Sequence, residues 1–282
     1  MIGVIIMKPN GRLSESFRAA GFSDGEIGSL MAGVAALRAE ELSFSEYFEE
    51  NFGDAFTASE TLYTLISETA AHYSNYVEGL SQTEKEGKIS TYTALSTLHT
   101  RASQEYLEIL TLVKNGFSDG AFARWRSMYE LSVISSFIRK FGEPVAEKFI
   151  EASDTQDRYD WAMESGAFSP NKRHVTFGDI VKLCDMDVDA WAENYTVANQ
   201  TVHASPQGTF GRLGAESGAS SRRSGYGVSA PAIQCANTLA LVSSMLFSLF
   251  PEQRTMEKMS LAAGWLDELI DAYCEAHEKL FE

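Results

Sequence analysis

The stretch from residue 117 to residue 142, FSDGAFARWRSMYELSVISSFIRKFG, most constrains the fold of this chain. Its apolar side chains recur at helical spacing, which predicts a helix of about six to seven turns. Because they cover most of the helix circumference, the helix is expected at the centre of a protein core. Gly116 is expected to end the preceding element, and Ser118 or Asp119 to cap the new helix.

Arg126 and Glu130 lie in the middle of this apolar stretch, four positions apart and therefore on one helix face. Charged groups there are costly unless they are paired, so we expect the two side chains to pair in the interior. A second pair with the same spacing, Arg101 and Glu105, lies on the helix predicted for residues 89–115. The short connection predicts that the two helices are antiparallel neighbours, so the pairs could form one buried network. Two unrelated surface pairs are the alternative.

The rest of the chain is also predicted to be helical, because strand alternation is missing after residue 24. Apolar residues at helical spacing predict further helices over residues 23–41, 55–80, 143–166, 175–184, 187–202, 230–250 and 253–281. The fold class is therefore all-α, a bundle of about seven to nine helices. Residues 1–50 are interpreted as an N-terminal appendage to a bundle domain of residues 51–282, with the acid-rich segment 40–54 as a solvated face.

One long irregular stretch, residues 205–229, interrupts the helical pattern. It holds six glycines and the arginines Arg212, Arg222 and Arg223 against a single acid, Glu216. A loop of this length inside a compact domain is usually functional or disordered. Its positive charge contrasts with the formal net charge of −16 for the whole chain. We expect this loop to be mobile and to close over an anion.

A polar stripe leads into this loop. Tyr195, Asn199 and His203 follow one another at four-residue intervals and share a face of the predicted helix. Histidine can act as a general base or acid near neutral pH, and arginines from the loop or Arg126 could hold an anion beside it. The alternative is a helix-terminal histidine that bonds the last carbonyls. The catalytic candidates are thus His203, Arg126, Glu130, Tyr195 and Asn199. The binding candidates are Arg101, Ser205, Arg212, Arg222 and Arg223.

The segments RASQEYLEIL, NGFSDGAFARWRSMYEL and ENYTVANQTVHASPQG resemble a bacterial family of uncharacterised helical proteins. That family's pattern is an arginine-x3-glutamate on a central helix and a later tyrosine followed by histidine-alanine-serine, and the resemblance covers about residues 90–250. The chain also resembles the HEPN superfamily, whose motif is an arginine, a polar residue, three further residues and a histidine. Asn199 and His203 match this motif, whereas Ala198 stands at the arginine position. The resemblance implies a metal-independent ribonuclease or nucleotide-processing protein of bacterial stress or phage defence, acting as a homodimer.

Composition and motifs narrow the range of binding partners and cofactors that we expect. The charge of −16 argues against non-specific DNA binding and against anionic membranes. None of the five histidines has a glutamate three residues before it, and phosphate-loop and dinucleotide-binding glycine motifs are missing, so neither a metal nor a cofactor is expected. Three cysteines without a CxxC motif are typical of the reducing cytoplasm. RNA or a nucleotide and a second copy of the chain are the expected partners. The alternative is a non-enzymatic helical interaction or scaffold protein.

Overall fold

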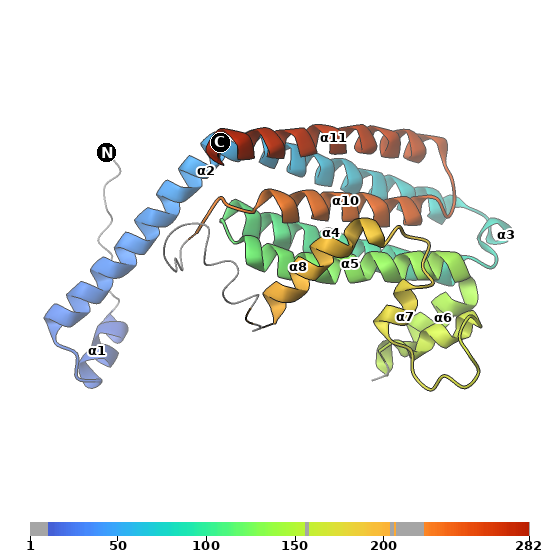
Figure 1. Ribbon diagram of the computed structural model, residues 1–282, viewed down its shortest axis with the longest axis horizontal. Coiled ribbons are helices and arrows are strands. Elements are labelled where there is room, and N and C mark those ends of the chain that lie inside the picture. The colour runs from blue at the N-terminus through green and yellow to red at the C-terminus, as the bar shows by residue number, and fades with distance from the viewer. Residues whose placement is uncertain (1–10, 156–157, 204–205, 207–222, 282) are drawn as a thin grey trace. The chain divides into compact units, whose positions relative to one another are not determined.

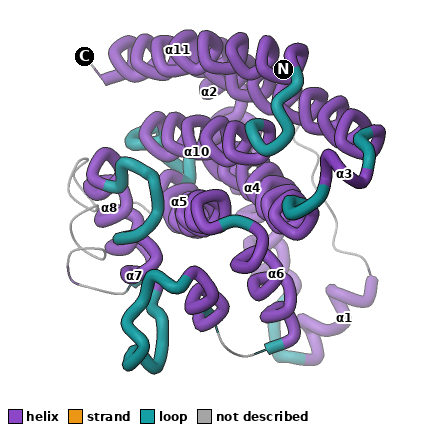
Figure 2. The backbone as a smooth tube through the Cα atoms, turned by 90° about the vertical axis from the view of Figure 1, so that its right-hand side faces the viewer, coloured by secondary structure: helices purple, strands orange, loops and turns teal. Residues whose placement is uncertain are grey.

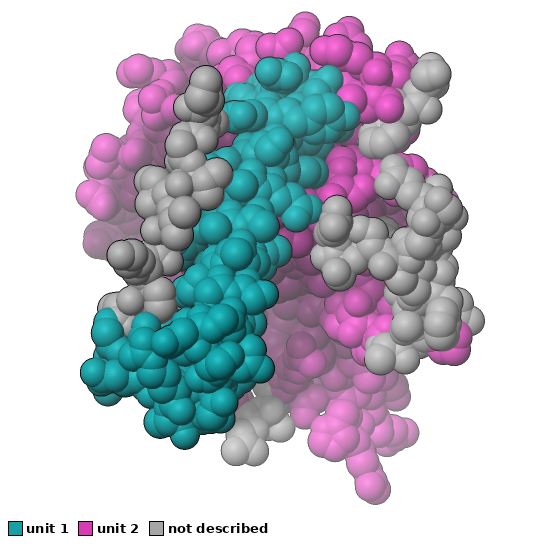
Figure 3. Space-filling view, turned by 90° about the vertical axis from the view of Figure 1, so that its left-hand side faces the viewer, with its two compact units in different colours: residues 1–53 teal, residues 54–282 magenta. Residues whose placement is uncertain are grey.

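The computed structural model describes residues 11–155, 158–203, 206 and 223–281. Every regular element within these residues is a helix, and eight of the helices have seven residues or more, which confirms the all-α bundle (Figure 1). The chain divides into two compact units, Met1–Gly53 and Asp54–Glu282 (Figure 3).

The first unit consists of α1 (Gly11–Ala19) and the start of a very long helix, α2 (Asp24–Gly79). Before α2, Ser23 and Glu26 form a reciprocal cap: the backbone N–H of Ser23 donates to Glu26 Oε2 at 2.8 Å, and the N–H of Glu26 donates to Ser23 Oγ at 3.3 Å. The prediction of separate helices over residues 23–41 and 55–80 is wrong. The acid-rich segment between them is helical because it contains no proline, and its single glycine keeps a helical backbone.

The second unit is built around three neighbouring helices, α4 (Ile89–Lys114), α5 (Ser118–Phe141) and α10 (Ser229–Phe247), which lie side by side in Figure 2. The turn between α4 and α5 contains Gly116 at φ +71°, a left-handed backbone that favours glycine. As predicted, α5 is central and largely buried. Its N-cap is Phe117 rather than Ser118 or Asp119, so the predicted side-chain cap is wrong.

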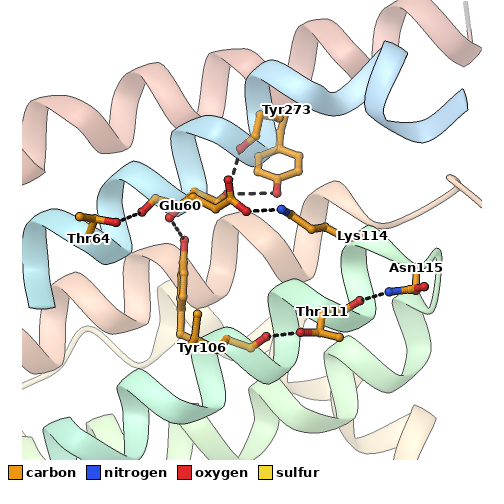
Figure 4. Close-up of polar contacts among 10 residues, drawn as sticks. Glu60, Thr64, Tyr106, Thr111, Lys114, Asn115 and Tyr273 are labelled. Atoms are coloured by element: carbon orange, nitrogen blue, oxygen red, sulfur yellow. Dashed lines mark hydrogen bonds and ion pairs between the residues drawn. The ribbon is translucent and has the colours of Figure 1, made fainter. Parts of the chain in front are cut away.

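The remaining part of α2 and the last helix, α11 (Gln253–Phe281), are tied to each other and to α4 by polar side chains (Figure 4). The Tyr106 hydroxyl on α4 donates to the backbone oxygen of Ser59 at 2.9 Å. The hydroxyls of Ser59 and Tyr273 lie 3.1 Å apart and share a hydrogen bond. Trp265 on α11 donates from Nε1 to the Ala58 oxygen at 2.9 Å. These bonds satisfy polar atoms inside an apolar core and so set the register between helices.

A series of short elements follows α5. The prediction of one helix over residues 143–166 is wrong, because α6 (Glu143–Glu151) ends early and 3₁₀ turns replace its continuation. The later short elements are α7 (Phe177–Val181), the 3₁₀ turn η3 (Asp189–Trp191) and α8 (Ala192–Val202). Within this series α8 packs mainly on α5, whereas α6 packs mainly on α4. The loop predicted for residues 205–229 lies mostly outside the described residues.

The buried helix α10 has the length and apolar composition of a membrane span, the sole one among the helices described; 61% of the window concerned is buried. It contributes Leu239, Val242, Leu246 and Phe247 to the core. A helix buried in a protein core can have the same apolar composition.

Candidate functional site

Arg126 connects α5 to α8. Its Nη2 lies 3.0 Å from Oε1 of Glu130, four residues later on the same helix, and its Nε donates to Asn199 Oδ1 at 2.6 Å. The side chains of Arg126 and Glu130 are 31% and 16% exposed, so the pair lies at the edge of the core rather than inside it. The predicted pairing of these two residues is therefore present, and α8 contributes the third member.

Tyr195 lies against this group, one turn before Asn199. The guanidinium carbon of Arg126 is 5.9 Å from the centre of the Tyr195 ring, within the range of a cation–π contact. Burial and the nearby Glu130 carboxylate raise the pKa of the Tyr195 hydroxyl. Tyr195 therefore stays a neutral phenol at physiological pH, able both to donate and to accept a hydrogen bond.

Aromatic side chains form a wall on the side of the Arg126–Glu130 pair where Tyr195 lies. The ring of Tyr195 lies 4.7 Å from that of Tyr129 on α5 and 6.3 Å from that of Phe177 on α7. Tyr159 completes the wall at 6.1 Å from Phe177, and burial together with the Glu130 carboxylate raises the pKa of its hydroxyl. Sequence reasoning did not place Tyr129, Tyr159 or Phe177 at this site. The position of Tyr129, three residues after Arg126, was the one local signal for any of them.

His203 is the C-cap of α8. Its backbone N–H donates to the Asn199 carbonyl at 3.3 Å, and its backbone turns to an extended conformation while the side chain is exposed. Asn199 is thus linked to Arg126 through its side chain and to His203 through its backbone. Arg126 and His203 therefore both bond Asn199, although 77 positions separate them along the chain.

The second predicted pair belongs to a different network, on the side of α5 that faces α4. Oε1 of Glu105 lies 3.1 Å from Nε of Arg101 and 3.5 Å from Nη2 of Arg124, and it accepts from the Ser127 hydroxyl at 3.0 Å. Glu105 is completely buried, and its Oε2 lacks a hydrogen-bond partner within the described part of the chain.

Among the described residues, no hydrogen bond or ion pair joins Arg101 or Glu105 to Arg126 or Glu130, so the single four-residue network is not formed there. The reason is helical geometry. Arg124 and Arg126 are two residues apart on α5 and so point about 200° away from each other.

Arg223 is the loop arginine whose position the structure describes. Its Nη1 donates to Asn115 Oδ1 at 2.6 Å, and its guanidinium lies 5.2 Å from the centre of the Phe117 ring. This corner of α4 and α5 is about two and a half turns from Arg126 along α5. Ser205, Arg212 and Arg222 lie outside the described residues.

The described residues offer little support for a metal site or for a cysteine nucleophile. Among them, no three His, Cys, Asp or Glu side chains gather closely enough to hold a metal ion. Burial raises the pKa of the Cys184 and Cys235 thiols, which disfavours the thiolate that a cysteine nucleophile needs.

Comparison with known proteins adds a partial match. Residues 92–171 match a family of unknown function, DUF5677. The matched region runs from α4 through α6 and includes the Arg101–Glu105 and Arg126–Glu130 pairs, whereas α8 with Asn199 and His203 lies beyond it. No curated protein and no solved structure matches the chain.

Proposed function

We propose that the protein is a metal-independent ribonuclease or nucleotide-processing enzyme whose site lies where Arg126 on α5 meets the C-terminal end of α8. The observation that carries this proposal is the 2.6 Å hydrogen bond from Arg126 Nε to Asn199 Oδ1. In the HEPN motif an arginine precedes the polar residue on the same helix, and here Ala198 occupies that position. Arg126 supplies the missing guanidinium from the neighbouring helix.

The guanidinium of Arg126 has donors left for a phosphate. The bonds to Asn199 and Glu130 use Nε and Nη2, while arginine carries five N–H groups in all. Donors held in place by two partners need little reorganisation when negative charge develops on a phosphate. Glu130 therefore positions Arg126 and does not act as a base.

RNA supplies its own nucleophile, the 2′-hydroxyl beside the scissile phosphate. His203 accepts the proton of that hydroxyl, the 2′-oxygen bonds to phosphorus, and the bond to the 5′-oxygen breaks. The leaving oxygen takes a proton from solvent, so the products are a 2′,3′-cyclic phosphate and a free 5′-hydroxyl. His203 suits this step because its exposed imidazole can reach a ligand and carries a nitrogen that can accept a proton.

The test is RNA cleavage by the purified protein in the presence of a chelator. We expect wild-type protein to cleave total RNA to products with cyclic phosphate ends, and His203→Ala and Arg126→Met to lose at least about a hundredfold in rate. His72→Ala is the matched histidine control, because His72 lies on α2 and pairs with Glu252 just before α11, two parts of the chain that contribute no residue to this site. Equal cleavage by wild type and His203→Ala, or cleavage by neither, would refute the enzymatic proposal.

A second function is favoured by one feature of the first unit. Leu30, Val34 and Leu37 are spaced by four and three residues on α2, and all are exposed, Leu37 by 67%. Such a row on one helix face is typical of a surface that binds another helix. We propose as the alternative a helical interaction protein that associates with itself through this face. Light scattering would test it, since Leu37→Ser should reduce the measured mass of an oligomer.

A further inference from the structure

A cavity of about 660 Å³ lies in the second unit beside the C-terminal half of α5. The end of α5, the C-terminal half of α10 and the segment 185–191 line it. Its volume is within the range of pockets that hold small organic ligands. Its polar lining comprises Ser136, Arg139, Lys140, Asp185, Asp187, Asn237, Ser244 and Ser248, and its apolar lining comprises Met186, Trp191, Leu241 and Met245.

An oriented aromatic ring forms part of the cavity wall. The indole of Trp191 stacks on that of Trp125 with an angle of 14° between the planes and 6.2 Å between the centres. Trp125 is fully buried, and its Nε1 donates to Thr238 Oγ1 on α10 at 3.0 Å. The plane of Trp191 is therefore set before any ligand arrives. Trp191 lines the cavity, and an aromatic ring that is already held in place can stack with a flat ligand at little entropic cost.

The polar groups from α10 present acceptors to the cavity. The Ser244 hydroxyl donates to the Leu241 oxygen at 2.8 Å, and the Ser248 hydroxyl donates to the Met245 oxygen at 3.2 Å. Nδ2 of Asn237 donates to the Ile233 oxygen at 3.1 Å. Because a hydroxyl has one hydrogen and each serine already donates it, both serine oxygens can only accept a hydrogen bond from a ligand. Oδ1 of Asn237 carries no hydrogen and can also only accept. The α10 side of the cavity thus suits a ligand edge that carries N–H donors.

The charges of the cavity balance. Lys140 Nζ lies 2.7 Å from Asp185 Oδ1 and donates to the Leu183 oxygen at 2.9 Å. Arg139 donates to the Ser248 oxygen at 3.3 Å, and Asp187 accepts from the backbone N–H of Ala190 at 3.4 Å. Two cations and two anions line the same space, so a bare phosphate has no net attraction to it. A ligand head that is neutral and carries both donors and acceptors fits better.

We propose that this cavity binds a purine base, stacked on Trp191, with an exocyclic amino group donating to the acceptors of α10. The N–H groups of Arg139 that do not bond Ser248 donate to the ring nitrogens of the purine. This assignment deepens the proposed function and rests on it, because the base would belong to the RNA or nucleotide that binds at the proposed phosphate site. Trp191 ends η3, and η3 leads directly into α8, which carries Asn199 and His203. From Trp191 to Asn199 the chain rises roughly 12 Å, which separates the base from the proposed phosphate site.

Calorimetric titration with adenosine tests the assignment without any cleavage. We expect adenosine to bind wild-type protein, and Trp191→Leu and Asn237→Leu each to weaken binding at least about tenfold. Purine riboside, which has the same ring without the 6-amino group, should bind about tenfold more weakly than adenosine, since an acceptor would be left unpaired. His203→Ala should bind adenosine as wild type does. Circular dichroism on each variant separates lost binding from lost folding.

Three outcomes would overturn the purine site. These are no adenosine binding at millimolar concentration, equal binding of adenosine and purine riboside, and binding of inorganic phosphate in place of adenosine. RNA cleavage without adenosine binding would leave the proposed enzyme standing and reject the cavity. Adenosine binding without RNA cleavage would support the cavity and reject the enzyme.

Discussion

Arg126 on α5 donates a hydrogen bond of 2.6 Å to Asn199 on α8, the residue one turn before the exposed His203. This bond joins two residues on different helices that lie 73 positions apart in the sequence. It holds the end of α8 against the central helix, so the position of His203 depends on a residue of α5.

We expect the Arg126–Asn199 bond to show a measurable coupling energy. Asn199→Ala, Arg126→Met and the double variant should give a coupling of about 1–2 kcal/mol in urea unfolding, because one partner is charged and the site is partly exposed. Thr196→Ala, an exposed change on the same helix, should lie within about 0.5 kcal/mol of wild type. A coupling near zero would mean that the bond does not hold α8.

The buried Glu105 should depend more on Arg124 than on Arg101. Arg101 is 61% exposed and Arg124 is 33% exposed, so the charge of Arg124 is less screened by water. We expect Arg124→Met to reduce the free energy of unfolding by about 2–3 kcal/mol and Arg101→Met by less than about 1 kcal/mol.

A second substitution checks this cause. Adding Glu105→Gln to Arg124→Met should recover much of the loss, because the double variant no longer contains a buried carboxylate whose one remaining cation is the mostly exposed Arg101. A double variant that is less stable than Arg124→Met alone would contradict this explanation.

Glu143 should stabilise α4 from a neighbouring helix. The carboxylate at the start of α6 accepts from the backbone N–H groups of Ser90 and Thr91 at 2.7 and 2.9 Å, at the N-terminus of α4. Burial raises the pKa of Glu143, but the hydrogen bonds from Ser90 and Thr91 outweigh it, so the pKa is lowered overall. Its contribution is present above the ordinary glutamate pKa and is lost as pH falls through the folded value.

We expect Glu143→Ala to cost about 1–2 kcal/mol in chemical unfolding at neutral pH. The difference from wild type should shrink toward acid pH. Glu147→Gln, an exposed change one turn further along α6, is the matched control and should leave stability unchanged. A difference that stays constant as pH falls would contradict the role of the carboxylate.

His99 should make the fold acid-sensitive. Burial lowers the pKa of His99 to about 4, while the unfolded chain has a histidine pKa near 6.5. The unfolded state therefore binds more protons between these values, and stability falls as pH is lowered through that window. The full loss is about 3 kcal/mol by pH 4.

Urea unfolding at pH 7, 6, 5 and 4 would measure this dependence. His99→Gln can still bond the Ser243 hydroxyl, which lies 3.0 Å from His99 Nε2, but it does not titrate. The free energy of unfolding of the wild type should fall relative to that of His99→Gln as pH is lowered. Parallel pH profiles for the two proteins would show that His99 does not carry the effect.

Local features of the chain were predictable from sequence because they depend on the geometry of one helix. Apolar spacing predicted the central helix to within a residue at each end, and the four-residue spacing predicted the contact between Arg126 and Glu130. The predictions failed where two local conformations, a continued helix and an interrupted one, are similar in free energy. The acid-rich segment before residue 54 continues α2, and the helix begun at Glu143 stops at Glu151.

The sequence by itself determined the all-α class, the central position of α5 and the pairing of Arg126 with Glu130, since 3.6-residue periodicity specifies which side chains share a face. Only the tertiary structure decided that Arg126 contacts Asn199, that Glu105 contacts Arg124 and Ser127 in addition to Arg101, and that Trp191 lines a cavity with α10. Those contacts depend on how each helix is rotated and shifted against its neighbours. Packing of the whole core sets that arrangement, and no local spacing encodes it.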